Sequence, residues 1–460
     1  MNFSTERLEE LCELIVDCPH STPTWTDSGF VVLRNQNIRD GVLDLSSPSF
    51  TDEEGFKSRI KRATPKENDI VFTREAPMGE VCLIPEGLTC CLGQRQVLLR
   101  AKKNINPHFL FWALQSPYVQ HQIFWNEGTG TTVSNVRIPF IKDLKIPRLV
   151  GMEDTIAFTL NSLAQKLSNN NKINRTLEQI AQALFKSWFI DFEPVKAKIM
   201  TLEAGGSQEE ATLAAMTAIS GKNADSLTVF EREHPEKYAE LRATAELFPS
   251  AMQNIDLVKI PRDWRLVPLS NIASFASGKI KVSELTKDTY ISTENMLVNK
   301  MGIECATSLP SANTTSSFKT EHILISNIRP YFKKIWLARF SGGRSADVLA
   351  FEHKKHITAE YLYNILYQDS FFDFMMQTSK GVKMPRGDKK AIMEWSCIEP
   401  DTRLVKVFSN KVKEFYSYIE SHNRENTQLS QLRDTLLPKL LSGEITLPEA
   451  EEIAKEADYV

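Results

Sequence analysis

The stretch TLEQIAQALFKSWFIDFEP, residues 176–194, has the pattern of a long helix that ends in several aromatic residues and a proline. A degenerate echo of it, TQLSQLRDTLLPKLLSGEI, occupies residues 427–445. The two copies lie about 252 residues apart, which is far longer than the period of a solenoid. The spacing therefore indicates that a whole domain followed by a long helix occurs twice in the chain.

Further similarities recur in the same order in both halves. The pairs are RLEELCELI (7–15) with RLVPLSNIA (265–273), NDIVFTREAPMGEVCLI (68–84) with EHILISNIRPYFKKIWL (321–337), GQRQVLLR (93–100) with GRSADVLAF (343–351), and GTGTTVSNVRIP (128–139) with SKGVKMPRGDKK (379–390). Short runs such as DIVFT, VCLI and QVLLR are typical of strands. Residues 108–124 and 360–376 are amphipathic helix candidates. Each half is thus expected to begin as a mixed α/β domain, which places the chain in the α+β class.

Both long helices carry a heptad, in which apolar residues recur at alternating steps of four and three. The seam positions are Ile156, Leu160, Leu163, Leu167, Asn170, Asn174, Leu177, Ala181, Leu184 and Trp188 in the first helix, and Phe408, Val412, Phe415, Ile419, His422, Asn426, Leu429, Arg433, Leu436 and Leu440 in the second. A sustained period of 3.5 residues is the signature of a coiled coil. Two unrelated core helices would not be expected to match at every step.

Polar residues occupy the middle of both seams, where they cost stability but fix register. In an antiparallel pair, Asn170 would meet Asn426 and Asn174 would meet His422. A parallel pair would also match polar layers. We expect the antiparallel pair, because a two-fold arrangement places one domain at each end of the helices.

The helix ends are apolar on more than one face, and a second apolar stripe needs a second partner. Phe185, Phe189, Leu437 and neighbouring residues lie outside the seam. The second partner is either the globular domain of the same chain or the helices of another protein.

Composition excludes several classes of protein. Hydrophobic residues make up 42% of the chain, yet no apolar run approaches the roughly 20 residues of a membrane span. The first residues lack the basic-then-apolar order of a secretion signal. The seven cysteines show no CxxC or zinc-type spacing, so we expect buried thiols in a reducing cytoplasm.

Charge is unevenly distributed along the chain. Acidic residues outnumber basic ones by nine to four in residues 201–250 and by six to one in residues 443–460. The net charge is −3, so the remainder of the chain carries about +7. The chain is mildly basic wherever it is not linker or tail.

Motifs for chemistry are not found in the sequence: there is no phosphate loop, GxGxxG, HExxH, nucleophile elbow or amino-methyltransferase motif. The remaining activity is binding. Basic stretches lie at equivalent places in the two halves, KSRIKRATPK (57–66) and NIRPYFKK (327–334), and are followed by polar, glycine-containing loops. Arg, Lys and Asn side chains contact phosphates and base edges. The plainer interpretation of any one cluster is a solvated surface.

The helix ends TLEQIAQALFKSWFIDFEPVKAK and QLRDTLLPKLLSGEI closely resemble those of the specificity subunits of type I restriction–modification systems, and the resemblance covers nearly the whole chain. It implies two target recognition domains at 1–150 and 258–400, long helices at 151–200 and 401–443, an acidic insert at 201–257 and an acidic tail at 444–460. The stretch IPRDW (260–264) is a family-like start for the second domain, which the first domain lacks.

The resemblance implies that each recognition domain reads half of a split DNA target and that the helices set the spacer. The chain would be non-catalytic and cytoplasmic. Two modification (methyltransferase) subunits and the restriction (translocase–nuclease) subunits would join it and bring S-adenosylmethionine, ATP and magnesium, none of which this chain would bind. The competing interpretations are a coiled-coil scaffold that does not read DNA and a self-contained enzyme.

Together, the basic stretches and the resemblance give a set of candidate contacts. The expected DNA-binding residues are Lys57, Arg59, Lys61, Arg62, Thr73, Arg74, Gln94, Arg95, Thr129, Thr131, Thr132, Asn135, Arg137, Asn327, Arg329, Tyr331, Lys333, Lys334, Ser345, Lys380, Lys383 and Arg386. The expected partner-binding residues are Phe185, Trp188, Phe189, Leu436, Leu437 and Leu440.

Overall fold

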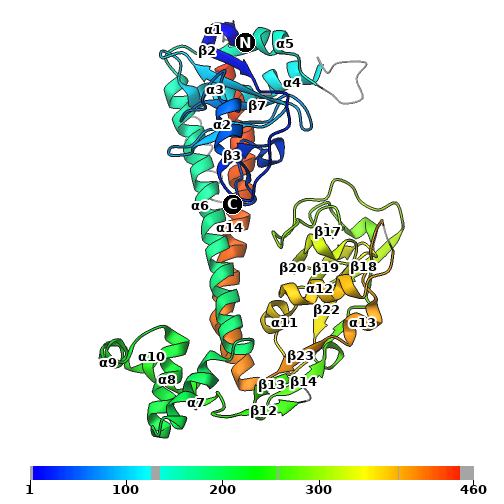
Figure 1. Cartoon of the computed structure of the whole chain (residues 1–460). Helices are drawn as coiled ribbons and strands as arrows, with labels where there is room; N and C mark the ends of the chain where they lie inside the picture. Colours follow the sequence, from blue (N-terminus) through cyan, green and yellow to red (C-terminus); the bar gives the residue numbers. More distant parts are fainter. Residues whose placement is uncertain (1–3, 126–134, 256–257, 382, 446–460) are drawn as a thin grey trace. The chain divides into compact units, whose positions relative to one another are not determined.

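A computed structural model describes residues 4–125, 135–255, 258–381 and 383–445 (Figure 1). The chain divides into two units: unit 1 contains residues 1–171 and 423–460, and unit 2 contains residues 172–422. Both units contain part of each long helix. Within the described ranges, no helix is long and apolar enough to cross a membrane.

Unit 1 is a mixed α/β domain. Its strands are β1 (Ser4–Arg7), β2 (Cys12–Asp17), β3 (Phe30–Leu33), β4 (Ile38–Arg39), β5 (Val42–Leu43), β6 (Ser49–Thr51), β7 (Ile70–Thr73), β8 (Val81–Leu83), β9 (Cys90–Leu92), β10 (Gln96–Ala101) and β11 (Lys145–Arg148). Its helices are α1 (Leu8–Leu11), α2 (Glu53–Arg59), α3 (Pro107–Gln115), α4 (Pro117–Trp125), α5 (Ile138–Asp143) and the beginning of α6 (Glu153–Phe189).

Unit 2 begins with the second half of α6, which is followed by four short helices, α7 (Glu193–Glu203), α8 (Gln208–Ser220), α9 (Ala224–Glu233) and α10 (Pro235–Glu246). Its strands are β12 (Met252–Ile255), β13 (Val258–Pro261), β14 (Arg265–Pro268), β15 (Ala273–Phe275), β16 (Lys279–Lys281), β17 (Tyr290–Ile291), β18 (Thr314–Phe318), β19 (Ile323–Ser326), β20 (Ile335–Leu337), β21 (Gly342–Arg344), β22 (Val348–His353) and β23 (Ser396–Glu399). The remaining helices are α11 (Ala359–Leu366), α12 (Asp369–Gln377), α13 (Lys389–Met393) and the beginning of α14 (Thr402–Ser442), with a short 3₁₀ turn, η4 (Pro330–Phe332).

The two units repeat one sheet topology. A four-stranded antiparallel sheet has the order β2-β10-β7-β8 in unit 1 and β15-β22-β19-β20 in unit 2. A parallel pair lies beside it in each unit, β3 with β9 and β17 with β21. In each unit, the strand that precedes a long helix in the chain pairs antiparallel with an early strand of the domain. These pairs are β11 with β1, before α6, and β23 with β14, before α14. The predicted duplication is confirmed at the level of topology.

The first strand pair also explains how unit 1 starts without an IPRDW stretch. That stretch lies in and after β13, which forms a hairpin with β12 ahead of β14 in unit 2. Trp264 from it is buried in the core of unit 2. Unit 1 instead opens directly with β1, the strand at the place of β14.

The inner strands β7 and β19 of the two four-stranded sheets lie at the centre of the units. All four residues of β7 and all four of β19 are buried. The helices predicted over 108–124 and 360–376 are each interrupted, giving α3 with α4 and α11 with α12. In unit 1 the break falls at Ser116, which precedes Pro117 and has an extended backbone (ψ 147°), as expected for a residue before proline.

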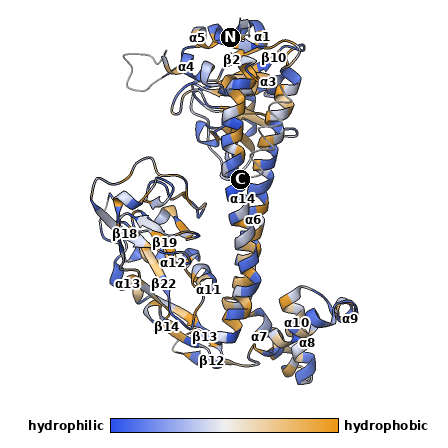
Figure 2. Ribbon diagram, turned by 180° about the vertical axis from the view of Figure 1, so that it is seen from behind, coloured by the Kyte–Doolittle hydropathy of each residue, from blue (hydrophilic) through white to orange (hydrophobic). Residues whose placement is uncertain are grey.

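The long helices pair antiparallel within each unit, as predicted. In unit 1, Asn170 of α6 donates from Nδ2 to Oδ1 of Asn426 of α14 at 3.0 Å. In unit 2, Nδ1 of His422 lies 2.8 Å from Oδ1 of Asn174. The residue number thus rises along one helix while it falls along the other. The predicted polar layers exist, and Figure 2 shows hydrophobic residues recurring along α6 and α14.

The acidic stretch after α6 folds into helices α7 to α10. Ser207 and Glu210 form a capping box at the start of α8, and Gly221 ends that helix in the left-handed conformation, the usual chemistry of helix ends. Ala215, Met216, Leu227, Leu241 and Ala245 form a small apolar cluster of their own. The stretch is therefore a helical module, and not an unstructured spacer.

Six of the seven cysteines are buried, as expected, but Cys305 is exposed. Burial raises the pKa of the Cys12 thiol to about 12 and that of Cys91 to about 11. Thiols of this kind stay protonated and unreactive at neutral pH.

Candidate nucleic-acid interface

Three predicted segments meet at the same place in each unit. In unit 1, the backbone N–H of Arg74 donates to the carbonyl of Arg95 (2.8 Å), and that of Val136 donates to the carbonyl of Arg74 (3.1 Å). In unit 2, the N–H of Asn327 donates to the carbonyl of Asp347 (2.8 Å), and Gly387 donates to Asn327 (3.4 Å). The segment after β7 or β19 thus lies between the turn before β10 or β22 and a third segment, which contains Val136 in unit 1 and Gly387 in unit 2.

Thr73 and Arg74 stabilise this junction through hydrogen bonds within the protein. Thr73 is fully buried, and its hydroxyl accepts a hydrogen bond from the N–H of Glu80 at 3.0 Å. The Nη1 atom of Arg74 lies 2.9 and 3.0 Å from the two carboxylate oxygens of Asp17, and its Nε donates to the carbonyl of Val136 at 3.0 Å. The expectation that Thr73 contacts DNA is wrong, because no part of its side chain is accessible. The guanidinium group of Arg74 forms hydrogen bonds mainly within the protein.

Arg59 also differs from the prediction. It is 5% exposed, and its guanidinium donates to the carbonyls of Leu92 (2.6 Å), Ser21 (3.0 Å) and Pro19 (3.1 Å). Burial lowers its pKa. Arg59 lies on the inward face of α2, one turn after the buried Phe56, so it ties three segments together and cannot contact DNA.

Unit 2 also contains a buried arginine that binds three backbone carbonyls, and this residue was not predicted from the sequence. Arg344 of β21 is 8% exposed and donates to the carbonyls of Val348 (2.5 Å), Ala276 (2.9 Å) and Ser317 (3.3 Å). Burial lowers its pKa as well. Arg59 and Arg344 are thus buried guanidinium groups that each join three backbone carbonyls within their unit.

The other predicted residues of unit 1 that the structure describes lie at or near the surface. Lys57 pairs with Glu53 at 2.6 Å, and Arg62 donates to the carbonyl of Asp17 at 3.2 Å. Arg95 is about half exposed and pairs with Glu75 at 3.0 Å. Lys61 and Arg137 are exposed, Asn135 is half-buried, and Gln94 donates to the carbonyl of His20 at 2.6 Å. Thr129, Thr131 and Thr132 lie outside the described residues.

In unit 2, polar atoms at the junction are buried without a hydrogen-bond partner among the described residues. They are Oδ1 of Asn327, Nε of Arg329 and Oγ of Ser345. The amide nitrogen of Asn327 is satisfied by the carbonyl of Gly387 at 3.2 Å. An unsatisfied buried polar atom costs about 1–3 kcal/mol, so this junction is less stable than a fully hydrogen-bonded one would be.

Tyr331 stands at the edge of this junction. It lies in η4 between Arg329 and Lys333, both of which have a left-handed backbone (φ 49° and 50°). Such strain in non-glycine residues is often retained at binding sites. The ring is 48% exposed.

The lysine side chains on either side of η4 already bind partners within the protein. Lys333 pairs with Asp369 at 2.9 Å, and Lys334 donates to the carbonyl of Thr293 at 2.7 Å. Burial lowers the pKa of Lys334. These bonds hold η4 against the neighbouring elements.

The loop after α12 carries further cations. Lys380 pairs with Asp388 at 2.7 Å, a bond that lowers the pKa of that carboxyl to about 2. Arg386 pairs with Asp347 through two hydrogen bonds of 3.0 and 3.2 Å, and Lys383 is exposed. These exposed pairs are weak enough for a phosphate to replace one partner.

The six residues expected to meet a protein partner are all buried within the chain itself. Phe185, Trp188 and Phe189 are at most 1% exposed and pack in the core of unit 2, whereas Leu436, Leu437 and Leu440 are at most 6% exposed and pack in the core of unit 1. The expectation that they form an exposed docking patch is wrong. The second apolar stripe of each helix end is covered by the globular domain beside it.

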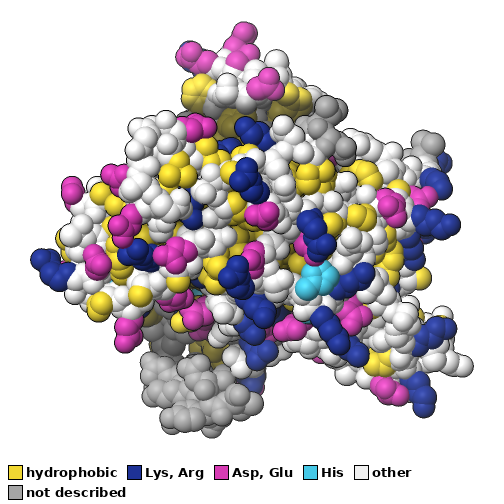
Figure 3. Space-filling model, turned by 90° about the horizontal axis from the view of Figure 1, so that it is seen from below, with side chains coloured by type: hydrophobic (Ala, Val, Ile, Leu, Met, Phe, Trp, Pro, Cys, Tyr) yellow, Lys and Arg dark blue, Asp and Glu magenta, His cyan; other side chains and the backbone are white. Residues whose placement is uncertain are grey.

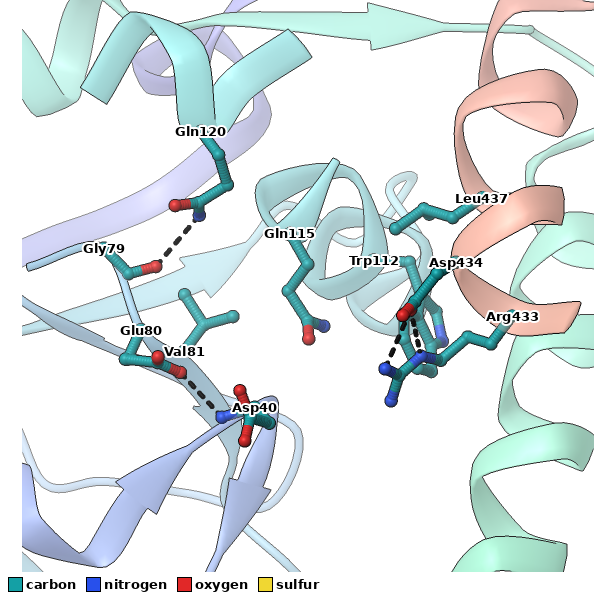
Figure 4. Close-up of a pocket in the computed structure, with 10 residues that line it drawn as sticks. All are labelled: Asp40, Gly79, Glu80, Val81, Trp112, Gln115, Gln120, Arg433, Asp434 and Leu437. Atoms are coloured by element: carbon teal, nitrogen blue, oxygen red, sulfur yellow. Dashed lines mark hydrogen bonds and ion pairs between the residues drawn. The ribbon is translucent and has the colours of Figure 1, made fainter. Parts of the chain in front are cut away.

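A hollow of about 280 Å³ lies in unit 1 between the β4–β5 hairpin, α3 and α14 (Figure 4). Its lining includes three carboxylates, Asp40, Glu80 and Asp434, and one cation, Arg433. Burial raises the pKa of Glu80, whose carboxylate accepts a hydrogen bond from the N–H of Asp40 at 2.8 Å. This lining is unsuited to phosphate, so the hollow is separate from the converging segments in function.

Comparison with known proteins agrees with the fold. Residues 2–179 match the family model described as type I restriction modification DNA specificity domain. The HindI specificity subunit of Haemophilus influenzae is 31% identical over 311 residues, which cover 62% of this chain and 65% of that protein. Residues 2–179 therefore match a type I DNA specificity domain, and the chain is similar to type I specificity subunits, of which it spans 65% of the length in the HindI protein.

Other type I specificity subunits match more of the chain at lower identity. The MjaIX specificity subunit of Methanocaldococcus jannaschii is 22% identical over 86% of this chain and 82% of its own length. The crystal structure of an S subunit from M. genitalium shares the fold, with a TM-score of 0.51, 17% identity and 96% coverage of both chains. The family model ends at residue 179, but the repeated strand order extends the specificity-subunit fold to unit 2.

Proposed function

We propose that this specificity subunit reads a bipartite DNA sequence, with one half-site for each unit. The observation that carries the proposal is the repetition of the same three converging segments in two copies of one fold. Each junction presents backbone turns, exposed cations and half-exposed polar side chains, which suit contacts to phosphates and base edges.

The low net charge of the chain supports the proposal that partner subunits contribute to DNA binding. The net charge of −3 is low for a protein that holds DNA alone. On the face drawn in Figure 3, Lys and Arg side chains lie interspersed with Asp and Glu side chains. Two modification subunits would supply the remaining phosphate contacts, together with S-adenosylmethionine, and restriction subunits would supply the ATP- and magnesium-dependent steps.

The partner surface is proposed on the exposed faces of the long helices, because the helix ends are buried. Ile173 and Ile180 of α6 are each 46% exposed and lie two helical turns apart, and Tyr418 of α14 is 61% exposed. Apolar residues at this spacing form a stripe that suits a helix of another protein.

Methylation mapping tests the proposal. Genomic DNA from cells that carry this chain with its modification subunit is sequenced for methylated adenine, and cells that lack only this chain serve as the control. We expect modified sites that share two short fixed sequences separated by a spacer of constant length and variable sequence. Modification that does not depend on this chain would favour a scaffold without DNA specificity.

A further inference from the structure

We propose that Asn364 of α11 is a positioning residue, which fixes the four-stranded sheet of unit 2 to both long helices and thereby sets where the second half-site is read. The inference rests on the proposed function and adds to it. The helices set the length of the spacer, and Asn364 keeps the sheet of unit 2 at one place along them. Asn364 is not among the residues predicted from the sequence.

Helix α11 packs against both the sheet and the long helices. All eight of its residues are buried. Leu362 and Ile365 belong to a core cluster that includes residues of β19 and β22. The ring of Tyr361 lies 5.6 Å from that of Phe185 on α6 and 6.5 Å from that of Phe408 on α14. Helix α11 therefore joins the sheet to both long helices.

The side chain of Asn364 is fully buried and binds both long helices. Its Nδ2 donates to the hydroxyl of Tyr416 on α14 (2.8 Å) and to the carbonyl of Glu360 (2.7 Å). Its Oδ1 accepts a hydrogen bond from Nε2 of Gln182 on α6 (2.7 Å). Gln368, which follows α11, donates to Oε1 of the same Gln182 at 3.2 Å. The amide of Asn364 thus uses its donors and its acceptor in one network.

This network gives the contact a direction that apolar packing lacks. The hydrophobic effect is non-directional, so it tolerates a shift of α11 along the helices. Hydrogen bonds require defined distances and angles. A shifted α11 would leave Asn364 and Tyr416, which are both buried, without partners, and burial of unpaired polar groups is costly. A satisfied buried network therefore selects one arrangement of the sheet on the helices.

Unit 1 has a corresponding bond at the equivalent place. Trp112 of α3 lies 252 residues before Asn364, which is the separation of the two copies of the long helix. Its Nε1 donates to Oδ1 of Asn161 on α6 at 2.8 Å. The same position of α3 and α11 is thus bound to the long helix that follows each domain, although the side chains differ.

The capping residues of the two helices repeat this pattern. Asn106, which caps α3, donates to Asp154 of α6 at 2.7 Å. Thr358, which caps α11, shares a hydrogen bond with Ser409 of α14. Two hydrogen bonds at separate points of one helix fix its direction as well as its position, so α3 and α11 are the positioning elements of their units.

The bond from Asn364 to the second long helix distinguishes unit 2. In unit 1, Trp112, Arg433 and Asp434 line the hollow between α3 and α14 (Figure 4). Arg433 and Asp434 bind each other there at 2.8 Å. Gln182 lies 252 residues before Asp434 and binds Asn364 instead. Asn364 is therefore the residue at which one substitution removes side-chain hydrogen bonds to both long helices.

The test measures methylation by the full complex of this chain with its modification subunit. The substrates are duplexes that carry the two half-sites found by methylation mapping, with the native spacer or with one base pair more or fewer. One base pair moves a half-site by about 3.4 Å and by about a tenth of a turn, so a firmly held sheet discriminates against both altered spacers. Asn364→Leu keeps the volume and removes the hydrogen bonds. We expect its preference for the native spacer, as a ratio of methylation rates, to fall at least about 10-fold, or ~1.4 kcal/mol.

A second variant separates positioning from stability. Asn364→Leu combined with Gln182→Met and Tyr416→Phe replaces the three groups of the network by apolar groups of similar volume, whereas Gln368 keeps its bond to the carbonyl of residue 364 (3.0 Å). Replacing both partners of a buried hydrogen bond in this way can be nearly neutral for stability. We expect the melting temperature to recover toward that of the unaltered chain, while the preference for the native spacer stays low.

Lys198→Met serves as the control. Lys198 of α7 is 2% exposed and donates to the carbonyl of Phe248 at 2.7 Å. This variant also removes a buried hydrogen bond of unit 2, but one that lies outside α11. It should lower the melting temperature and leave the preference for the native spacer unchanged.

The outcomes separate the inference from the proposed function. An unchanged preference for the native spacer in the triple variant would overturn the inference, because the hydrogen bonds would then contribute only stability. Loss of assembly in both Asn364 variants would also overturn it, since Asn364 would then be needed for folding and not for positioning. If the unaltered complex methylates DNA without regard to the half-sites or the spacer, the proposed function itself fails.

Discussion

Removal of one heptad from each long helix, residues 167–173 and 423–429, is expected to abolish modification of the native target. The two segments face each other across the antiparallel pair, because the pairs Asn170–Asn426 and Asn174–His422 set the register. Their joint removal leaves the second polar layer and the remaining register intact. Seven residues correspond to about 10.5 Å of helix at 1.5 Å per residue, or about three base pairs at 3.4 Å each.

The shortened chain should retain its two half-sites. A heptad is two turns of a coiled coil, so each unit keeps its orientation about the helix pair. The DNA, in contrast, turns by about a third of its 10.5-base-pair repeat over three base pairs. We therefore expect weak methylation at most, at sites whose spacer is about three base pairs shorter.

Methylation mapping checks this prediction. A chain of full length in which exposed Asn169 and Lys172 are replaced by Ala serves as the control and should keep the native target. Native spacing in the shortened chain would show that the helices do not set the distance.

Replacement of Trp188 by Ala is expected to destabilise unit 2 by about 3–5 kcal/mol, the usual cost of removing a large aromatic from a core. Trp188 is fully buried, with its ring 5.2 Å from that of Phe248 and 6.1 Å from that of Phe408. Urea unfolding followed by circular dichroism measures the loss. Ile180→Ala, at an exposed position of the same helix, should change stability by less than about 1 kcal/mol.

The same variant decides between a core role and a docking role for Trp188. We expect any loss of the modification subunit to accompany unfolding of unit 2. A Trp188→Ala chain that remains as stable as the unaltered one, yet no longer copurifies with the modification subunit, would restore the docking role.

The helix pair was predictable because its signal is local and periodic. The heptad and the polar residues at Asn170, Asn174, His422 and Asn426 determine which residues meet. The alternation of short apolar runs likewise located β7, β8 and β10, and the duplication located their counterparts in unit 2. The break between α3 and α4 was missed although Ser116–Pro117 signals it.

The site residues were less predictable, because the sequence does not reveal which face of a polar cluster is buried. Arg59 belongs to the same basic run as Lys57 and Lys61, and only the packing of α2 turns it inward. Phe185 and Leu437 gave a correct signal, a second apolar stripe, but the sequence left open whether the same chain or another protein covers it.

The most direct test of two independent reading units joined by a helix pair is an exchange of domains. Residues 258–400 are replaced by the corresponding segment of another specificity subunit whose target is known, and the methylated sites of the host are mapped. One half of the target should change to the donor's half-site, and the other half should stay as it is in the unaltered protein. A change in both halves, or in neither, would contradict the account.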